Sequence, residues 1–408
     1  MTEANHAELS PSRASSHLWP SRPYEILNWL VLETSGQRFI DNLFVELCQR
    51  LNNMGVSVAR AALNFMVENP QFRGARILWR RELKEAEFTT YAYGSENTVE
   101  YRNSPVHDIH AGLTELRYRL DTPPLPGEYA IYADLRAQGL TEYCAWPLNH
   151  TFDKRHVVTF SSDQPGGFTD DEIETLRNLV PAISLVSEIR LKNRIARTLL
   201  ETYVGPHASQ AILDGATRRG SGTTVGAAIL ICDLRDFTHI SDMWPRDDVI
   251  ELLNGYFDAM SEPIEKFGGE ILKFMGDGLL AIFPLSDPDA CANLVAAIEE
   301  AQVHLDALNQ ANIKRGHDPL GYGIGVHVGD VMYGNIGSKR RLDFTVIGPA
   351  VNIASRLESL TKEIKRPVLM SDTFVEMAGN IRNFENVGLR TLRGLETPIN
   401  VYALPSHP

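Results

Sequence analysis

The spacing of apolar residues changes several times along the chain, and each change predicts a different kind of element. Apolar side chains recur at intervals of three and four from Phe39 to Leu51, and a second helical run is expected over 58–63. Apolar and polar residues then alternate in five stretches that predict strands: 73–81, 86–94, 127–135, 141–148 and 156–163. Together these elements predict an α+β domain over residues 37–190.

A long helix is predicted after the turn-forming stretch that closes this domain. Asp170, Asp171 and Glu172 suit its first turn, because acidic side chains are favourable at a helix N-terminus. Pro181 lies inside the pattern and predicts a kink. The apolar stripe that follows favours a parallel two-chain coil, and packing against the chain's own domain is the alternative. The stripe consists of Ile183, Val186, Ile189, Ile195, Leu199 and Val204. We interpret 170–222 as a signalling helix and hinge.

Length and composition indicate the number of domains and the cellular location to expect. The chain has 408 residues, more than one hydrophobic core usually serves, so two domains are expected. Residues 1–36 are rich in Ser, Pro and Ala with little periodicity, which predicts a mobile leader. No apolar run is long enough to span a bilayer and no signal-peptide core is present, so we expect a cytoplasmic protein without a membrane span.

Charge and cysteine usage exclude further classes of protein. The formal net charge of -13 disfavours nucleic-acid binding, which needs clustered Lys and Arg. Four cysteines occur without CxxC spacing, which argues against a zinc site or a disulfide framework. They are Cys48, Cys144, Cys232 and Cys291, and we expect reduced core residues.

Two aspartates stand out in the C-terminal half. An apolar strand ends at Asp233 and runs into a helix start, an arrangement suited to Mg²⁺ beside a triphosphate, although a capping aspartate alone would explain it. A predicted hairpin over 268–284 places Asp277 in its Gly-Asp-Gly turn. With the hairpin beside the first strand, the two carboxylates would repel each other unless cations lie between them. A pair of Mg²⁺ ions would relieve that repulsion and suit phosphoryl transfer.

Three motifs now carry a resemblance to a known family. ICDLRDFT, GEILKFMGDG and TVIGPAVNIASRLE resemble the motifs of class III adenylate/guanylate cyclases, in family order and spacing over 223–404. The order of elements over 37–190, with a late strand ending in SSDQPGGF and a final helix, resembles a GAF domain. The resemblances imply an α+β chain: a GAF-like sensor, a helical linker and a ferredoxin-like cyclase catalytic domain.

The cyclase resemblance implies roles for the first two motifs. Asp233 and Asp277 match the ligands of two Mg²⁺ or Mn²⁺ ions per site, and Leu234 matches a residue that lends its carbonyl. Phe237 and Thr238 lie in the loop that resembles the phosphate cradle.

The resemblance also implies how the nucleotide is recognised. Lys273 matches the residue that hydrogen-bonds the purine, and Thr345 matches the second base-selecting position. An ammonium donates to adenine N1 and a hydroxyl accepts from the 6-amino group, so this pair favours ATP. Guanylate cyclases carry Glu and a small residue there. Asn352 and Arg356 share a helix face and match the pair that positions the ribose and stabilises charge on the α-phosphoryl group.

Basic residues at two places match positions that contact the β- and γ-phosphates. One is Arg340 or Arg341, which are adjacent, and the other is Arg393; a solvated basic loop is the alternative for the adjacent pair. At Pro349 the chain departs from the Asp that many relatives carry. Proline is tolerated in a first helical turn, so we expect preserved geometry.

The implied activity is an adenylate cyclase that forms cyclic AMP and pyrophosphate from ATP at the interface of a head-to-tail homodimer. An unknown small-molecule regulator is expected at the N-terminal domain. His107 and His110 are three residues apart and could face a metal or haem, but we favour two surface histidines. The alternatives are a cyclase for GTP or a pyrimidine triphosphate, and a ligand-sensing protein whose cyclase-like domain only dimerises.

Overall fold

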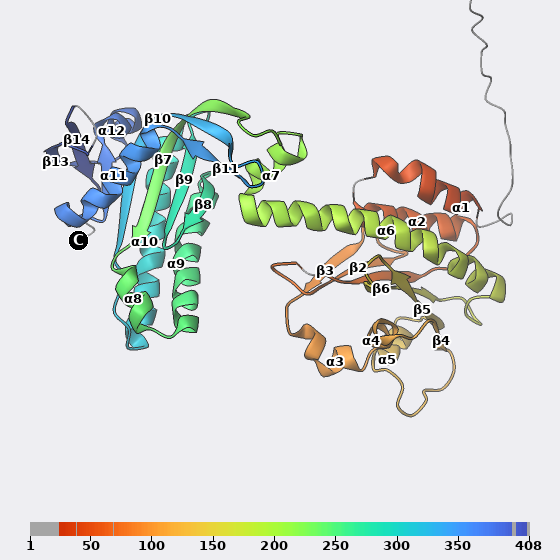
Figure 1. Cartoon of the computed structure of the whole chain (residues 1–408). Helices are drawn as coiled ribbons and strands as arrows, with labels where there is room; N and C mark the ends of the chain where they lie inside the picture. The colour runs from red at the N-terminus through yellow and green to blue at the C-terminus, as the bar shows by residue number, and fades with distance from the viewer. Residues whose placement is uncertain (1–23, 38, 68, 394–396, 406–408) are drawn as a thin grey trace, which may run out of the picture. The chain divides into compact units, whose positions relative to one another are not determined.

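The computed structural model describes residues 24–405 apart from 38, 68 and 394–396 (Figure 1). By its internal contacts the chain divides into two compact units, residues 1–199 and 200–408. The division falls inside α6 (Asp170–Val204), the long helix.

The N-terminal unit is built on a six-stranded antiparallel sheet. Its strand order is β3-β2-β1-β6-β5-β4, so β1 and β6 are central. The strands are β1 (Arg60–Met66), β2 (Gly74–Arg80), β3 (Glu87–Tyr91), β4 (Leu116–Arg119), β5 (Glu142–Asn149) and β6 (Arg155–Ser162).

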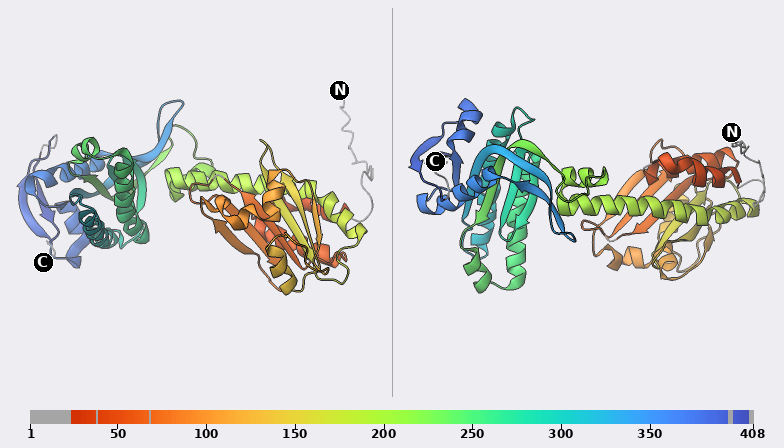
Figure 2. Two further views of the ribbon diagram at one scale, coloured as in Figure 1. Left: turned by 90° about the horizontal axis from the view of Figure 1, so that it is seen from below. Right: turned by 45° about the horizontal axis from the view of Figure 1, so that its top comes forward.

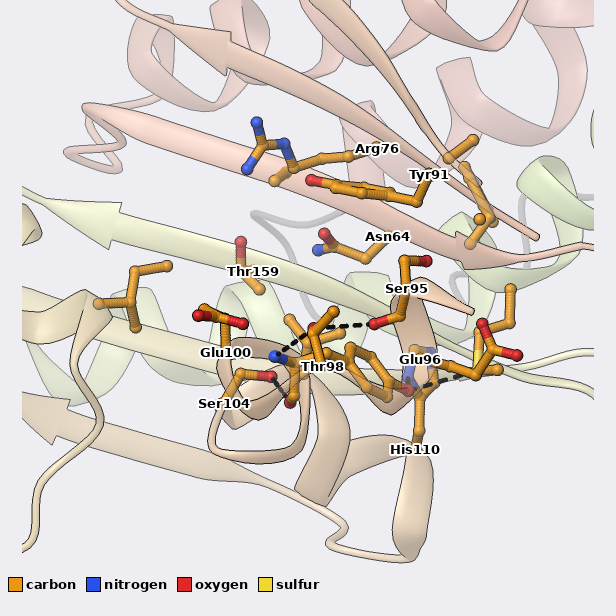
Figure 3. Close-up of a pocket in the computed structure, with 18 of the residues that line it drawn as sticks. Asn64, Arg76, Tyr91, Ser95, Glu96, Thr98, Glu100, Ser104, His110 and Thr159 are labelled. Carbon is orange, nitrogen blue, oxygen red and sulfur yellow. Dashed lines mark hydrogen bonds between the residues drawn. The ribbon is translucent and has the colours of Figure 1, made fainter. Parts of the chain in front are cut away.

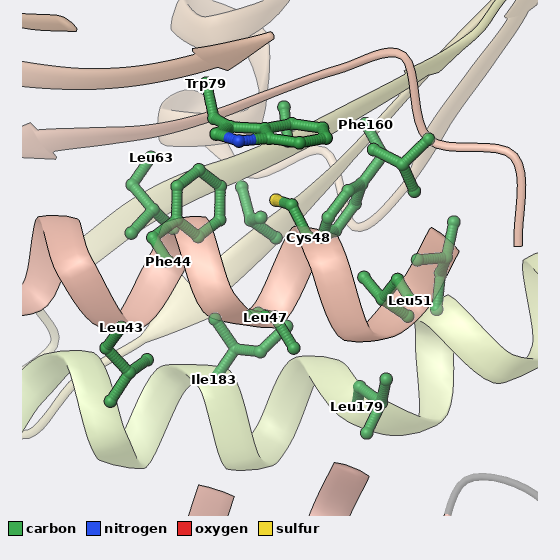
Figure 4. Packing of buried hydrophobic residues seen from close by; sticks show 14 of the residues in the cluster. Leu43, Phe44, Leu47, Cys48, Leu51, Leu63, Trp79, Phe160, Leu179 and Ile183 are labelled. Carbon is green, nitrogen blue, oxygen red and sulfur yellow. The ribbon is translucent and has the colours of Figure 1, made fainter. Parts of the chain in front are cut away.

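Helices cover both faces of this sheet. On one face, α2 (Ile40–Asn53) and α6 pack Phe44, Leu47 and Ile183 against Leu63 and Trp79 of the strands (Figure 4). A second cluster on the other face includes side chains of α4 (Pro105–Ala111) and α5 (Ile131–Ala137). Between β3 and α4 the chain forms the short turns η3 (Ser95–Asn97) and α3 (Val99–Arg102).

Two predicted elements of this unit are wrong in type. The run predicted as a helix over 58–63 is mostly strand β1, and the strand predicted over 127–135 gives way to α5. A central strand that is buried on both faces has a continuous run of apolar residues. Periodicity alone does not distinguish such a run from a buried helix. In α5, Tyr132 and Leu135 are the buried pair, at a helical spacing of three.

The predicted leader is also corrected. Residues 24–36 are helical, as α1 (Tyr24–Asn28), the π-helix η1 (Trp29–Glu33) and the 3-10 turn η2 (Thr34–Gly36). Ile26, Trp29 and Leu30 are 1–3% exposed and belong to the main core. The apolar residues in this short segment are too few for their spacing to predict a helix from the sequence. The rest of the predicted leader, 1–23, lies outside the described residues.

The apolar stripe of α6 does not lie on a single surface. Ile183 and Val186 are buried in the core of their own unit, and Ile195 packs partly against it, as the alternative interpretation expected. Leu185 and Ile189 are 55% and 49% exposed on the same helix. A seam with a second chain therefore stays a prediction for the exposed residues only. α6 continues through Pro181 as one element.

The C-terminal unit has an eight-stranded sheet with β7 (Gly222–Leu234) near its centre. The strand order is β13-β14-β12-β10-β7-β9-β8, and β11 pairs with β10. The other strands are β8 (Glu270–Met275), β9 (Gly278–Pro284), β10 (Tyr322–Gly337), β11 (Leu342–Ile347), β12 (Val368–Ser371), β13 (Glu385–Arg390) and β14 (Ile399–Ala403). All pairings are antiparallel except that of β10 with β12.

Helices again cover both faces of this sheet (Figures 1 and 2). One face packs on α9 (Arg246–Lys266) and α10 (Ala290–Lys314), and the other packs on α11 (Pro349–Ile364). Short helices α7 (Pro206–Leu213), α8 (Phe237–Met243) and α12 (Asp372–Ala378) complete the unit, with the 3-10 turn η4 (Gly379–Ile381). Successive side chains of β7 point to opposite faces of the sheet. Its even-numbered apolar residues therefore pack in the core with α9 and α10, and its odd-numbered ones pack in the core with α11.

Two of the expectations from composition can be compared with the structure. All four cysteines are buried free thiols, as predicted. Within the described part of the chain, no helix has both the length and the apolar character needed to cross a bilayer.

Substitution of Trp29 tests whether the helical segment at 24–36 packs into the core of the N-terminal unit. We expect Trp29→Ala to lower the free energy of unfolding of the N-terminal unit by about 3–5 kcal/mol, because it removes a buried ring over which the Arg50 guanidinium lies at 4.5 Å. Val31→Ala, on the same short helix but 54% exposed, should change it by less than about 0.5 kcal/mol. Urea denaturation followed by circular dichroism measures both, and equal effects would contradict the packing.

Candidate active site

The sequence-predicted aspartates meet at one end of the C-terminal sheet. β7 ends at Leu234, and Asp233 is paired with Gly278 at the start of β9. Asp277 directly precedes Gly278 in the β8–β9 turn, where Gly276 has a φ of 72°. A side chain at 278 would bring a Cβ within 2.8 Å of the Cys232 carbonyl and 2.9 Å of the Asp233 Oδ1. Glycine at 278 therefore permits the close approach of the hairpin turn to the end of β7.

The electrostatics of Asp233 reflect that approach. Burial, then the negative charges of Asp277 and Glu358, raise the pKa of Asp233 from 3.8 to about 6, while Arg235 and Lys362 oppose the rise. The site thus has an excess of negative charge that its own cations do not neutralise. Carboxylate oxygens in such a place are suitable ligands for a hard divalent cation.

The protein alone supplies few ligands for such a cation. Within the described residues no cluster of three or more His, Cys, Asp or Glu side chains has metal-binding geometry. Mg²⁺ is commonly held by one or two carboxylates together with substrate phosphates and water. Asp233 and Asp277 fit this second kind of site, in which the ion arrives with an anionic substrate. Leu234 is 2% exposed, with its side chain in the core.

One residue beside the aspartates was not singled out from the sequence. The Arg235 guanidinium donates to the Glu358 Oε1 at 2.9 Å and to the Glu358 carbonyl oxygen at 3.2 Å. A Cβ at position 323 would lie 1.7 Å from Arg235 Nη2, so Gly323 leaves the space that this guanidinium fills. The buried ion pair attaches the end of β7 to α11. Arg235 lies within ICDLRDFT, but a solvated loop arginine would have the same sequence pattern.

The predicted base-reading residues lie on a second group of elements. β11 lies beside β8, and Val346 and Leu272 belong to one apolar cluster, which brings Thr345 and Lys273 into the same neighbourhood. Thr345 is 5% exposed, and its hydroxyl has no hydrogen-bond partner within the described residues. Lys273 is exposed. A buried hydroxyl without a partner is unusual, and it leaves the hydrogen-bonding capacity of Thr345 open to a group outside the described residues.

The helix that follows β11 carries the predicted catalytic pair. α11 starts at Pro349, so proline occupies the first helical turn as expected. Ala350 and Ala354 pack this helix on the sheet, while Asn352 is exposed and Arg356 half-buried. Neither polar side chain has a hydrogen bond or ion pair with another described residue.

The two groups of predicted residues make no direct polar contact among the described residues. No hydrogen bond or ion pair there joins Asp233 or Asp277 to Lys273, Thr345 or Arg356. The cations with the largest effect on the pKa of Asp233 are Arg235 and Lys362 instead. We name the two groups by their predicted roles: a metal half-site at the end of β7, and a base half-site of β8, β11 and α11.

Of the predicted phosphate-contacting residues, Phe237 and Thr238 form the start of helix α8 rather than a loop. Phe237 begins α8 and is half-buried, and Thr238 is exposed. Arg340 and Arg341 lie in the β10–β11 turn, where Arg341 is 3.9 Å from Asp343 with both side chains largely exposed. Arg393 is exposed between β13 and β14, on the sheet edge opposite β8.

Comparisons with known proteins agree with this arrangement of motifs. Residues 222–406 match the family model of the adenylate and guanylate cyclase catalytic domain. An adenylate cyclase of Anabaena cylindrica is 30% identical over 247 residues, which are 57% of this chain and 48% of that protein. The chain spans from about a quarter to about half of the length of its first curated relatives.

Two solved cyclase structures are similar to slightly less than half of this chain. An adenylyl cyclase from P. aeruginosa is 26% identical over 46% of this chain and 97% of its own, with a TM-score of 0.43. A guanylyl cyclase is 34% identical over 45% of this chain and 92% of its own, with a TM-score of 0.41.

The raised pKa of Asp233 predicts how stability depends on pH without metal. The folded protein retains a proton on Asp233 up to about pH 6, whereas the unfolded chain releases it near 3.8. Ionised Asp233 therefore destabilises the fold above about pH 6, and this penalty disappears below about pH 4. In the presence of a chelator, Asp233→Asn should raise the melting temperature by a few degrees at pH 8, on the order expected for about 1 kcal/mol, and should not change it at pH 4.

Two further variants sharpen this measurement. Asp277→Asn should also raise the melting temperature at pH 8, because it removes one of the charges that act on Asp233. Asp258→Asn, at an exposed position in the middle of α9, is the control and should have no such effect. A melting temperature of Asp233→Asn that falls at pH 8 would contradict the assignment.

Proposed function

We propose that this chain, whose C-terminal unit carries an adenylate and guanylate cyclase catalytic domain, is an adenylate cyclase that converts ATP to 3′,5′-cyclic AMP and pyrophosphate. The observation that carries the proposal is the juxtaposition of Asp233 and Asp277 at the end of β7, within the matched domain. The N-terminal unit acts as a GAF-like sensor that regulates the reaction.

Asp233 and Asp277 hold two divalent ions, Mg²⁺ or Mn²⁺, and the carbonyl of Leu234 contributes a further ligand. When bound, such ions lower the pKa of the attacking 3′-hydroxyl and neutralise the triphosphate. The chain's own contribution is to keep two carboxylates close to each other on rigid strands, so that the substrate binds to a preformed site. The start of α8 with Phe237 and Thr238 lies beside the aspartates and cradles the phosphates.

Lys273 and Thr345 select adenine. The ammonium donates to the ring nitrogen N1, and the Thr345 hydroxyl, which has no partner in the described structure, accepts from the 6-amino group. Asn352 orients the ribose. The Arg356 guanidinium stabilises the charge that develops on the α-phosphoryl group, and Arg340 or Arg341 with Arg393 contacts the β- and γ-phosphates.

The complete site forms between two copies of the chain. One copy supplies the metal half-site and the other supplies the base half-site, as a head-to-tail homodimer with two equivalent sites. The support for this is that no hydrogen bond or ion pair among the described residues joins the two aspartates to Lys273, Thr345 or Arg356 within one chain. A dimer also gives the exposed Leu185 and Ile189 of α6 a partner surface.

The segment after α6 offers a route for regulation within the C-terminal unit. His207 of α7 lies 3.3 Å from the buried Glu270 carboxylate, which accepts a hydrogen bond of 2.5 Å from the Tyr333 hydroxyl. Glu270 is the first residue of β8, the strand that carries Lys273. A displacement of α6 would therefore reach the base half-site through α7 and Glu270.

Replacement of a metal-half residue tests the activity directly. Asp233→Ala should lower cyclic AMP formation by at least about 10³-fold, because one carboxylate ligand is lost, while the protein stays folded. Measurement is by chromatography of nucleotide products with Mg²⁺ and with Mn²⁺. Turnover at the wild-type rate in this variant would refute the assignment.

Mixing inactive variants tests the shared site. Asp277→Ala and Arg356→Ala chains, each inactive alone, should regain up to about a quarter of wild-type activity when mixed, since half of the dimers are mixed and each has one intact site. The control is a mixture of Asp277→Ala and Asp233→Ala, which leaves every metal half-site damaged and should stay inactive. Chain exchange without recovered activity in the first mixture would rule out the interfacial site.

Thr345 tests base recognition. Thr345→Val should lower kcat/KM for ATP about 10-fold or more without lowering the melting temperature, because the hydroxyl has no partner inside the chain. Thr361→Val is the matched control: that buried hydroxyl donates to the Glu358 carbonyl, so its loss should lower the melting temperature. Assays with ATP, GTP, CTP and UTP give the specificity, and unchanged discrimination in Thr345→Val would contradict the role.

A further inference from the structure

A cavity of about 430 Å³ lies in the N-terminal unit, on the sheet face opposite α2 and α6. Figure 3 shows its two walls: Asn64, Arg76, Tyr91 and Thr159 come from the sheet, and Thr98, Glu100, Ser104 and His110 come from the segment of η3 to α4. A cavity of this size suits a small organic molecule.

Strand alternation places positive charge on the sheet side of this cavity. Along β1, Ala61 and Leu63 enter the helix-covered core, so Arg60 and Asn64 face the cavity. Asn64 is paired with Arg76 of β2, which lines the same cavity. Two guanidinium groups therefore approach one space from neighbouring strands.

Arg60 is the decisive residue because its charge is largely buried and no described acidic side chain forms an ion pair with it. It is 8% exposed, its buried Nε has no hydrogen-bond partner among the described residues, and Glu87 affects its pKa only from a distance. The Nε of Arg76 is likewise buried without a partner. Burial lowers the pKa of Arg60, but a guanidinium remains charged at neutral pH. A buried charge without a counter-charge costs several kcal/mol, so a ligand that supplies one is favoured.

The acidic residues around the cavity do not supply that counter-charge. Glu100 and Asp134 line the cavity but are exposed, and Glu96 accepts a hydrogen bond of 2.9 Å from the Gly94 amide. Among the described residues none of the three lies within ion-pair distance of Arg60. They form a solvated rim, whereas the arginine lies deep.

The remaining lining favours a planar group. Tyr91 presents its ring near Arg76, whose guanidinium lies 5.9 Å from the ring centroid, and Tyr101 adds aromatic surface. The Tyr101 hydroxyl is 2.9 Å from His110 Nδ1, which leaves the buried Nε2 of that histidine without a partner among the described residues. The cavity thus combines three arginines, Arg60, Arg73 and Arg76, with aromatic walls and an unused imidazole nitrogen.

We propose that this cavity binds a small organic anion, with its acidic group paired to Arg60 and Arg76 and its planar part against Tyr91. A regulatory effect of such binding rests on the sensor role proposed above, whereas the binding itself does not. Binding is measured without any cyclase reaction, so failure of the binding proposal and failure of the catalytic proposal are distinguishable.

The test compares two fluorescent probes that differ in charge, on the full chain. The aromatic sulfonate 8-anilinonaphthalene-1-sulfonate should bind with an affinity that Arg60→Met weakens by at least about 10-fold. The uncharged N-phenyl-1-naphthylamine should change less than about two-fold. Arg119→Met removes an exposed arginine that is paired with Asp121 on the same sheet, and it should leave both affinities unchanged. Equal sulfonate binding by wild type and Arg60→Met would overturn the proposal.

The melting temperature of the unliganded variant provides a second readout. Removing an unpaired buried charge should leave the melting temperature of Arg60→Met equal to or above that of wild type. A lower value would show that Arg60 has a structural partner and would contradict the argument. Arg76→Met, at a second of the three arginines that line the cavity, should weaken sulfonate binding in the same direction, and no effect in either variant would also overturn the proposal.

Discussion

The close approach of Asp233 and Asp277 is the constraint on which the C-terminal unit depends. The register of β7 with β9 brings the hairpin turn to the end of β7, and Gly278 leaves room for it. The Arg235–Glu358 ion pair attaches the same strand end to α11. The fold thus holds two like charges together at a cost to stability, which a divalent cation with an anionic substrate would offset.

The proposed dimer divides the site between two chains. β7 carries the metal half-site at its end, while the base half-site lies on β8, β11 and α11 and holds the Thr345 hydroxyl, which has no partner among the described residues. In that proposal a second copy supplies the complementary half-site. Regulation would then require only that α6 and α7 alter how the two half-sites meet, and Glu270 connects α7 to β8 and β10. The proposed ligand cavity in the N-terminal unit would give that regulation a chemical signal.

The sequence predicted the positions of the two aspartates in the fold better than it predicted the type of some elements in the N-terminal unit. Asp233 and Asp277 were found because a strand end and a glycine turn leave clear local signals. Arg235 was missed because its role depends on Glu358, which is distant in sequence and gives no local signal. β1 was mistaken for a helix because burial on both faces hides its alternation. The Arg60 cavity could not be predicted, since an unpaired charge is recognised only when all its neighbours are known.

The central claim is that the two aspartates form a cation site with the nucleotide. Electron paramagnetic resonance of Mn²⁺ tests it most directly, on the full chain with 3′-deoxy-ATP, which lacks the attacking hydroxyl. The account predicts that wild-type protein retains two coupled Mn²⁺ ions per site, that Asp277→Asn loses the coupled signal, and that Asp258→Asn at the exposed α9 position retains it. The same Mn²⁺ signal in wild type and Asp277→Asn would contradict the account.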